Sequence, residues 1–538
     1  MKPRSKRQIL LRRVVNGLRY LSRGDLRGLA RGVRTVWNGQ TDEIARTALA
    51  DVLGMFAPAP VAVAPLVVET DILIPVYNGV ELLSPLFASL LRNTHSPYRL
   101  IIVDDCSTDS RIRPILENVV LSSPNTLLLH NERNLGFIGS INRAAKQVRS
   151  NFVLLNTDVE VPPGWLERLM APLLKDPKIA SATPFTNAGT ICSFPVMNQD
   201  NPLPAGSTVD QVDAAFRHVM SDCPYVELPS GVGFCMAVNH AVWSKIGGFD
   251  AAFGRGFGEE NDWCQRAKRA GFLNVLAANL FVYHKHGGSF PSVEKQQLLS
   301  SNLQTLRRRY PSYDRDVRKF IKRDTLAGLR QFLKLLVARY LSPTGVLIAD
   351  HQIGGGANTY RRNAVAQRLQ SGDAVLVCTP SLRNRAAYEL DLFLSWGEAR
   401  FSFDDLNDLS EVARYLAIGE VFVNNLVDWP RPLAALTCFT DIKHRTGARL
   451  TLPVHDFYSI CPSYNLLNKD GRYCDLPAIT DCRQCLPKNR FAHNPESADI
   501  DTWRARWREL IAGAHEVLCF SNNSLSLLQR VYYLGEGR

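Results

Sequence analysis

The sequence of 538 residues lacks any run of about 18 apolar residues, the length that a helix needs to cross a bilayer. Its longest apolar-rich stretch, 52–68, contains Pro58, Pro60 and Pro65 and is predicted to be a linker. The N-terminus is too rich in arginine, and its apolar residues are too scattered, for a signal peptide. Twelve cysteines without a secretion signal favour reduced thiols and a cytoplasmic location.

Acidic residues are almost missing from the first 37 residues, where Asp25 stands alone against eleven lysines and arginines. This segment contributes +10 of the net charge of +12, so the rest of the chain is nearly neutral and no nucleic-acid partner is expected. Leu10, Val14 and Leu18 have the spacing of an amphipathic helix with a basic polar face. Residues 1–37 therefore form either a peripheral membrane contact, on the inner face of the cytoplasmic membrane, or a solvated arm.

Apolar residues make up 46% of the chain, which is typical of folded globular domains and excludes collagen-like or disordered classes. Short apolar runs and helical patterns alternate between 69 and 292, which predicts an α/β domain with a mainly parallel sheet. The expected strands are 70–76, 100–103, 126–129, 152–155 and 179–183, and the expected helices are 80–91, 111–121 and 137–148. Ligands of such sheets bind at the carboxyl ends of the strands.

The remaining chain divides into a helical connector at 293–343 and a second α/β region at 344–538, after an arm and proline-rich linker at 1–68. The second region opens with a strand at 345–349 and a turn that contains Gly354, Gly355 and Gly356. The further strands expected there are 374–378, 421–424, 449–454 and 517–520. The whole chain is therefore predicted to carry two α/β units.

Polar residues follow three expected strands of the first α/β region. Asp104 and Asp105 end the second strand, and Asn156 and Asp158 follow the fourth. A carboxylate there can accept hydrogen bonds from a base or ribose, or ligate Mg²⁺ or Mn²⁺. Aspartate also caps helices after strands, so each site alone is a weak signal, but their common position favours one ligand site.

The order of these and later motifs resembles glycosyltransferase family 2. The motifs are IPVYNG, VDDCSTD, NERNLGF, LLNTDVEVPPGWL, SGVGFCMAV, FGRGFGEENDWCQRA and YHKHGGSF, spread over about 70–290. The similarity is greatest to bacterial members that build surface polysaccharide, including the rhamnosyltransferase-like group. The resemblance implies a GT-A fold, inversion at the anomeric carbon and a Mg²⁺ or Mn²⁺ cofactor. It also implies a nucleotide-diphosphate sugar donor and a glycan or lipid-linked glycan acceptor.

The resemblance also assigns roles to individual residues. Those implied for nucleotide-sugar binding are Pro75, Tyr77, Asn78, Asp104, Asp105, Asn134, Gly136 and Asn156. Asp158 matches the last acid of the family's Asp-x-Asp metal motif, whose first position is Asn156 here. His284 matches a late histidine near the metal or diphosphate, with His286 as a close competitor.

The acidic helix start Gly258 to Trp263 matches the family motif that supplies the catalytic base. Glu260 is the expected base and Glu259 its nearest competitor, since relatives usually present Glu-Asp where this chain has Glu-Glu. Without the resemblance, these acids would equally fit a helix N-terminus whose dipole they complement. Trp263 itself fits either a sugar-stacking face or the core. The nearby loop with Gly231 and Gly233 is implied to approach the acceptor.

The second α/β region resembles the N-terminal half of a GT-B enzyme of the glycosyltransferase family 4 kind. The similar segments are the Gly354–Gly356 turn, the segment LPVHDF at 452–457 and the segment LCFSN at 518–522. In such enzymes this half mainly holds the acceptor, and a second half binds the donor. The chain ends at Arg538 before a second half, so this region is not expected to catalyse transfer alone.

Four cysteines lie close together in the sequence of this region. They are Cys461, Cys474, Cys482 and Cys485, and the last two form a C-x-x-C pair. Four thiolates suit a structural Zn²⁺ that closes an irregular loop, while the uneven spacing equally suits free thiols or a disulfide.

Two other functions fit parts of the sequence. A non-catalytic glycan-binding or scaffold protein would explain Asn156 and the Glu-Glu variation. A nucleotidyltransferase would carry a glycine-rich, basic phosphate loop after the first strand, where this chain has Tyr77, Asn78 and Gly79. An inverting glycosyltransferase therefore remains the leading hypothesis.

Overall fold

The computed structural model describes residues 46–538 except 221–224, 286–291, 385, 494–498 and 535–538. The predicted amphipathic segment 1–37 lies outside the described residues. Thr47–Arg538 form one compact unit. Among the described helices, none combines the length and apolarity needed to cross a membrane.

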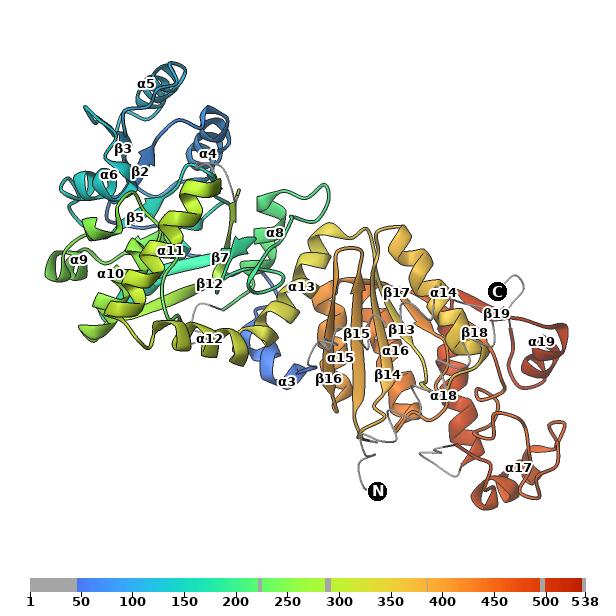
Figure 1. Ribbon diagram of the computed structural model, residues 1–538. Coiled ribbons are helices and arrows are strands. Elements are labelled where there is room, and N and C mark those ends of the chain that lie inside the picture. Colours follow the sequence, from blue (N-terminus) through green and yellow to red (C-terminus); the bar gives the residue numbers. More distant parts are fainter. Residues whose placement is uncertain (1–45, 221–224, 286–291, 385, 494–498, 535–538) are drawn as a thin grey trace. The chain divides into compact units, whose positions relative to one another are not determined.

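A mixed sheet forms the centre of the first α/β region (Figure 1). Its strands are β2 (Thr70–Val76), β3 (Tyr98–Asp104), β4 (Thr126–His130), β5 (Phe152–Leu155), β6 (Val159–Glu160), β7 (Ile179–Thr186), β10 (Val226–Glu227), β11 (Cys235–Val238) and β12 (Leu273–His284). The strand order is β10-β12-β7-β11-β5-β2-β3-β4, and β6 pairs with β12. Strands β5, β2, β3 and β4 run parallel, and β11 is antiparallel to both β5 and β7. The carboxyl ends of β2, β3 and β5 therefore lie at one edge.

Helices cover both faces of this sheet. They are α4 (Val80–Asn93), α5 (Ile112–Ser122), α6 (Gly136–Ala145), α7 (Trp165–Lys175), α8 (Val209–Phe216), α9 (His240–Ile246) and α10 (Glu259–Arg269). Side chains alternate across a strand, so Ile72 and Ile74 of β2 join the core under α4, α5 and α7. Leu73 points to the other core, under α6, α9 and α10. A strand buried on both faces needs the continuous apolar run that β2 has.

Three helices connect the two α/β regions. They are α11 (Ser292–Arg309), α12 (Tyr313–Arg323) and α13 (Ala327–Leu341). Helix α13 is the most deeply buried, with Phe332, Leu333, Leu335 and Leu336 fully excluded from solvent. It packs against α8 and the second α/β region, so the connector forms part of a continuous core.

A second sheet lies in the second α/β region. Its strands are β13 (Gly345–Ala349), β14 (Ala374–Pro380), β15 (Tyr388–Leu394), β16 (Gly397–Phe403), β17 (Ile418–Val423), β18 (Arg449–Val454) and β19 (Glu516–Cys519). Its helices are α14 (Gly356–Gln370), α15 (Leu406–Leu416), α16 (Pro432–Thr446), α17 (Ile479–Cys485), α18 (Ile500–Gly513) and α19 (Asn522–Gln529). Strands β14, β13, β17, β18 and β19 are parallel neighbours, whereas β15 and β16 add an antiparallel hairpin.

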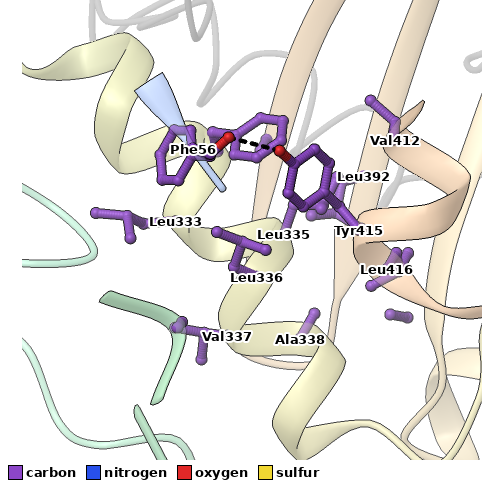
Figure 2. Close-up of a cluster of buried hydrophobic side chains, with 14 of the residues drawn as sticks. Phe56, Leu333, Leu335, Leu336, Val337, Ala338, Leu392, Val412, Tyr415 and Leu416 are labelled. Carbon is purple, nitrogen blue, oxygen red and sulfur yellow. Dashed lines mark hydrogen bonds between the residues drawn. The ribbon is translucent and has the colours of Figure 1, made fainter. Parts of the chain in front are cut away.

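Residues 47–56, which the sequence assigns to the end of the arm and the start of the linker, carry regular structure. They form strand β1 (Thr47–Ala48), which pairs with β16, helix α3 (Leu49–Val52) and a 3₁₀ turn at Leu53–Met55. Phe56 packs on Phe332 with ring centroids 4.5 Å apart. Figure 2 shows Phe56 among the side chains of α13, where the Tyr415 hydroxyl donates to the Phe56 carbonyl at 2.7 Å. Apolar burial therefore outweighs the irregular local sequence here.

The mixed α/β class with largely parallel sheets, expected from the sequence, is confirmed. The expected strands 70–76, 152–155, 345–349 and 449–454 have the observed bounds, and the others lie within a few residues of them. The β15–β16 hairpin was not expected. The boundaries 1–68, 69–292, 293–343 and 344–538 stay predictions.

Candidate active site

A cavity of about 510 Å³ opens at the carboxyl edge of the first sheet. This volume is typical of small-molecule sites. Ten of the residues predicted from the sequence line it: Pro75, Tyr77, Asp105, Asn134, Gly136, Asn156, Asp158, Glu259, Glu260 and His284. The strand ends and the start of α10 therefore face one space. A smaller cavity, of about 40 Å³, lies beside β17 and β18 of the second sheet.

Asp105 fixes the loop that leads into α6. Its Oδ1 accepts hydrogen bonds from Asn131 Nδ2 and from Leu135 N, both at 2.7 Å, and its Oδ2 accepts from Gly136 N at 2.8 Å. The carboxylate is 3% exposed, so these bonds satisfy a buried charge. Asp105 thereby shapes the cavity wall as well as lining it.

Asn78 and Asp104 lie beside the cavity without lining it. Asn78 Oδ1 accepts from the backbone N–H groups of Thr108 and Asp109 at 2.9 and 3.1 Å. Asp104 accepts from Ser107 N at 3.0 Å and lies 3.3 Å from His130 Nδ1. Both side chains hold the loop after β3, so this geometry gives them a positioning role.

Gly136 and Asn134 meet the loop before α10. Gly136 has φ +73°, and a Cβ there would lie 3.0 Å from Arg255 Cα. Asn134 Oδ1 accepts from the Arg255 guanidinium at 3.0 Å. Arg255 therefore forms part of the cavity wall, a role that sequence reasoning missed although it lies within the FGRGFGEENDWCQRA motif.

Asp158 lies in the turn between β5 and β6, and His284 ends β12, so the two come together from distant parts of the sequence. Asp158 Oδ2 lies 3.4 Å from His284 Nε2, and Asp158 Oδ1 is buried without a hydrogen-bond partner. The His284 ring stacks on Phe234 with centroids 4.8 Å apart and an interplanar angle of 17°. An orphaned carboxylate oxygen beside an imidazole is a donor set that fits Mg²⁺ or Mn²⁺. His286 lies outside the described residues.

Glu259 and Glu260 occupy the first turn of α10. Glu260 accepts from Gly258 N at 3.2 Å and from Asn261 Nδ2 at 2.9 Å. Burial raises the pKa of both carboxyls, and the charge of Glu260 adds to the rise in the pKa of Glu259. Burial beside a second carboxylate therefore raises the pKa of Glu259 further than that of Glu260.

Asn261 links Glu260 to the connector helices. Its Oδ1 accepts from Ser230 Oγ and from the Tyr313 hydroxyl, each at 2.7 Å. With its oxygen held by two donors, the amide must present its NH₂ group to Glu260. Tyr313 begins α12, 52 residues after Asn261, and no sequence signal pointed to it.

Trp263 belongs to the core. Of the two roles that the sequence allowed, sugar stacking and core packing, the structure therefore shows the second. Trp263 is fully buried, its indole N–H donates to Gly247 O at 3.1 Å, and it packs on Trp243. The loop from Gly231 to Phe234, which the resemblance implies to be near the acceptor, lines the cavity instead. A Cβ at Gly233 would lie 3.6 Å from Glu260 Cβ, so this glycine faces Glu260.

The four clustered cysteines are free, half-buried thiols. Neighbouring thiols add to the effect of burial in raising the pKa of Cys461 to about 12. Across the part of the chain that the structure describes, no three His, Cys, Asp or Glu side chains gather closely enough to hold a metal ion by themselves. Zinc at Cys461, Cys474, Cys482 and Cys485 and the alternative of free thiols both stay predictions.

Residues 71–240 match the family described as Glycosyl transferase family 2. This segment holds β2 to β11 and all but the late elements of the site. By this match the segment is a glycosyltransferase domain. A comparison with curated proteins found no match.

Several solved glycosyltransferase structures are similar to parts of the chain. A mannosyltransferase of Pyrobaculum calidifontis with GDP-Man and Mn²⁺ is 14% identical, with a TM-score of 0.35, over 58% of this chain and 82% of that one. GalNAc-T7 with UDP, GalNAc and Mn²⁺ is 18% identical, with a TM-score of 0.34, over 44% of this chain. That similarity spans about half, 47%, of the GalNAc-T7 chain. S. aureus TarS 1–349 is 12% identical, with a TM-score of 0.31. The match covers 51% of this chain and 79% of that one.

Proposed function

We propose that the protein is an inverting hexosyltransferase that moves a sugar from a nucleotide-diphosphate donor to a hydroxyl of a growing bacterial cell-surface glycan. One observation carries the proposal. Asp158 and His284 line the same 510 Å³ cavity as Glu260, so a diphosphate-binding end and a base lie in one space. Such a pairing is what transfer from a phosphorylated sugar requires.

Glu260 is the proposed general base. Its carboxylate takes the proton of the acceptor hydroxyl while the hydroxyl oxygen forms a bond to the anomeric carbon. The bond from that carbon to the diphosphate oxygen breaks on the opposite face, so the configuration inverts. Asn261 Nδ2 and Gly258 N hold the carboxylate in place during this step.

Asp158 and His284 are the proposed ligands of a divalent cation, Mg²⁺ or Mn²⁺. The buried, unpartnered Asp158 Oδ1 supports this assignment. A cation held there with the donor diphosphate would neutralise the negative charge that develops on the leaving group. Asn156 lines the cavity beside Asp158, so its amide can contact the donor even though it is a poorer ligand than a carboxylate.

The acceptor and the cellular setting extend the proposal. A lipid-linked glycan acceptor and membrane contact through residues 1–37 follow from the family resemblance and from the charge of that segment. The second α/β region is proposed to be a GT-B-like half that assists acceptor binding. Its support is the parallel order β14-β13-β17-β18-β19. The rhamnosyltransferase-like group is the proposed subgroup.

Calorimetric titration with UDP, dTDP and GDP, with and without Mn²⁺, tests the proposal. Metal-dependent binding of one nucleotide is expected, and Asp158→Ala should abolish the metal dependence. Donor turnover by the wild type should follow the same nucleotide preference. Absence of binding for all three nucleotides would reject the transferase proposal and favour a glycan-binding scaffold, which glycan arrays would then test.

A further inference from the structure

Helix α12 has three distinct strips along its surface. Arg315, Arg318, Lys319 and Lys322 follow the spacing i, i+3, i+4, i+7, so they share one face, and all four are exposed. Arg323 is also exposed and extends this face at the C-terminal end of the helix. We call Arg315, Arg318, Lys319 and Lys322 the basic stripe. Lys322 lies in the last turn, where a cation complements the helix dipole, but Arg315, Arg318 and Lys319 lie before that turn and repel each other.

The opposite face of α12 packs on the protein. Val317, Phe320 and Ile321 are partly buried against the main core. Tyr313 and Val317 line the catalytic cavity. The basic stripe therefore lies on the outer side of the helix whose inner side closes the active site.

Acidic residues of α12 lie between these two faces. Asp314 accepts from Arg307 at 2.6 Å, and Asp316 accepts from Ser312 Oγ at 3.0 Å. Arg315 lies 3.8 Å from Asp316, the only described ion pair of a stripe residue. Within the described part of the chain, Lys319 and Lys322 form no ion pair, so most of the stripe's charge faces solvent.

We propose that the basic stripe docks the catalytic domain on an anionic lipid bilayer. Exposed lysines and arginines near a membrane surface are attracted to anionic headgroups without a shaped pocket. The stripe offers charge in a row, with no aromatic side chain among its four positions to stack on a nucleic-acid base. Residues 1–37, with a charge of +10, provide a second cationic element on the same chain.

Docking through α12 brings the catalytic cavity next to the bilayer. This consequence rests on the proposed function, because a lipid-linked acceptor would then meet Glu260 without leaving the membrane. The docking itself does not depend on transfer, since the stripe residues do not line the cavity.

The test is co-sedimentation of the full chain with vesicles of phosphatidylcholine alone or with 30% phosphatidylglycerol. The stripe variant carries Arg315→Gln, Arg318→Gln, Lys319→Gln and Lys322→Gln, which remove four charges but keep good helix formers. The control variant carries Lys488→Gln, Arg490→Gln, Arg506→Gln and Arg508→Gln, four exposed cations of the second α/β region. Thermal unfolding and nucleotide binding check that both variants are folded.

The wild type should bind the anionic vesicles and not the neutral ones. The stripe variant should partition at least tenfold more weakly, and the control variant within about twofold of wild type, because local rather than total charge determines docking. Equal losses in the two variants, or an unchanged stripe variant, would overturn the proposal. So would displacement of the wild type from anionic vesicles by millimolar inorganic pyrophosphate at constant ionic strength, which would indicate a soluble phosphate ligand. If the wild type and both variants all failed to bind nucleotide, this result would count against the proposed function and not against membrane docking.

Discussion

Asn261 Nδ2 donates a hydrogen bond to Glu260 Oε1 at 2.9 Å, while the oxygen of the same amide accepts from Ser230 and Tyr313. A side-chain amide held at both ends cannot flip without losing three hydrogen bonds. The orientation of Glu260 is therefore coupled to the connector helix that begins at Tyr313. Helix α12 therefore helps to hold the side chain of the proposed base.

Glu260→Gln should lower donor turnover by about 10²–10⁴-fold, the usual contribution of a general base. Nucleotide binding should change little, because the substitution is isosteric and leaves the proposed metal ligands, Asp158 and His284, unchanged. In the wild type, kcat/KM should fall as the pH drops through the pKa of Glu260, which burial raises above its ordinary value. Rate profiles from pH 4 to 9 check both expectations. Wild-type activity in the Gln variant would show that another group is the base.

Tyr313→Phe should lower kcat about fivefold, since it removes one hydrogen bond of about 1 kcal/mol from the Asn261 amide. KM for the donor should stay the same. Tyr310→Phe is the matched control, because its hydroxyl donates to Asp262 Oδ1 at 2.9 Å and does not contact Asn261. Both variants should lose similar stability, and only Tyr313→Phe should lose rate. Equal rate losses would assign Tyr313 a purely structural role.

The sequence alone was sufficient to predict the site residues whose positions follow from the order of the strands. Asp105 and Asp158 follow strands β3 and β5, and parallel strands place their carboxyl ends at one edge. Glu260 was predictable because it opens an acidic helix within a recognisable motif. These positions depend on local patterns that repeat wherever such strands and helices occur.

The remaining features depend on packing between distant segments. Tyr313 reaches the site only because α12 folds back on α10, and Trp263 is core because α9 and α10 pack together. The local sequence of residues 47–56 is typical of an arm or a linker. Phe56 nevertheless packs on Phe332, nearly three hundred positions later. Such contacts cannot be predicted from hydrophobic periodicity or from the spacing of motifs.

Asp158→Asn should weaken Mn²⁺-dependent nucleotide binding at least tenfold, because an amide is a much poorer ligand for a hard cation than a carboxylate. Binding in the absence of metal should change less than twofold. Glu160→Gln, two positions along the chain, is the control and should behave as the wild type. Calorimetry with and without Mn²⁺ measures the nucleotide affinity of both variants. A parallel weakening with and without metal would indicate that Asp158 contacts the donor directly.

Glu259→Gln should stabilise the folded protein at neutral pH. The pKa of Glu259 is raised in the folded state, so above its unfolded pKa the folded chain binds more protons than the unfolded chain. Its contribution to stability therefore falls as the pH rises from about 4.3 through the raised folded pKa. The gain in Tm for the Gln variant should be absent near pH 4 and grow toward pH 8. A constant difference in Tm across this range would contradict the assignment.

Gly136→Ala should destabilise the protein by about 2–3 kcal/mol, of which about 1 kcal/mol is the cost of a side chain at positive φ. The remainder comes from the new Cβ, which would lie 3.0 Å from Arg255 Cα and push the two walls of the cavity apart. Gly206→Ala is the control, since its φ is +77° and no atom lies within 4 Å of its added Cβ. Chemical denaturation of the two variants separates the two contributions, and nucleotide affinity should fall only for Gly136→Ala. If both variants lose the same stability and retain affinity, the close approach of Gly136 to Arg255 does not shape the donor site.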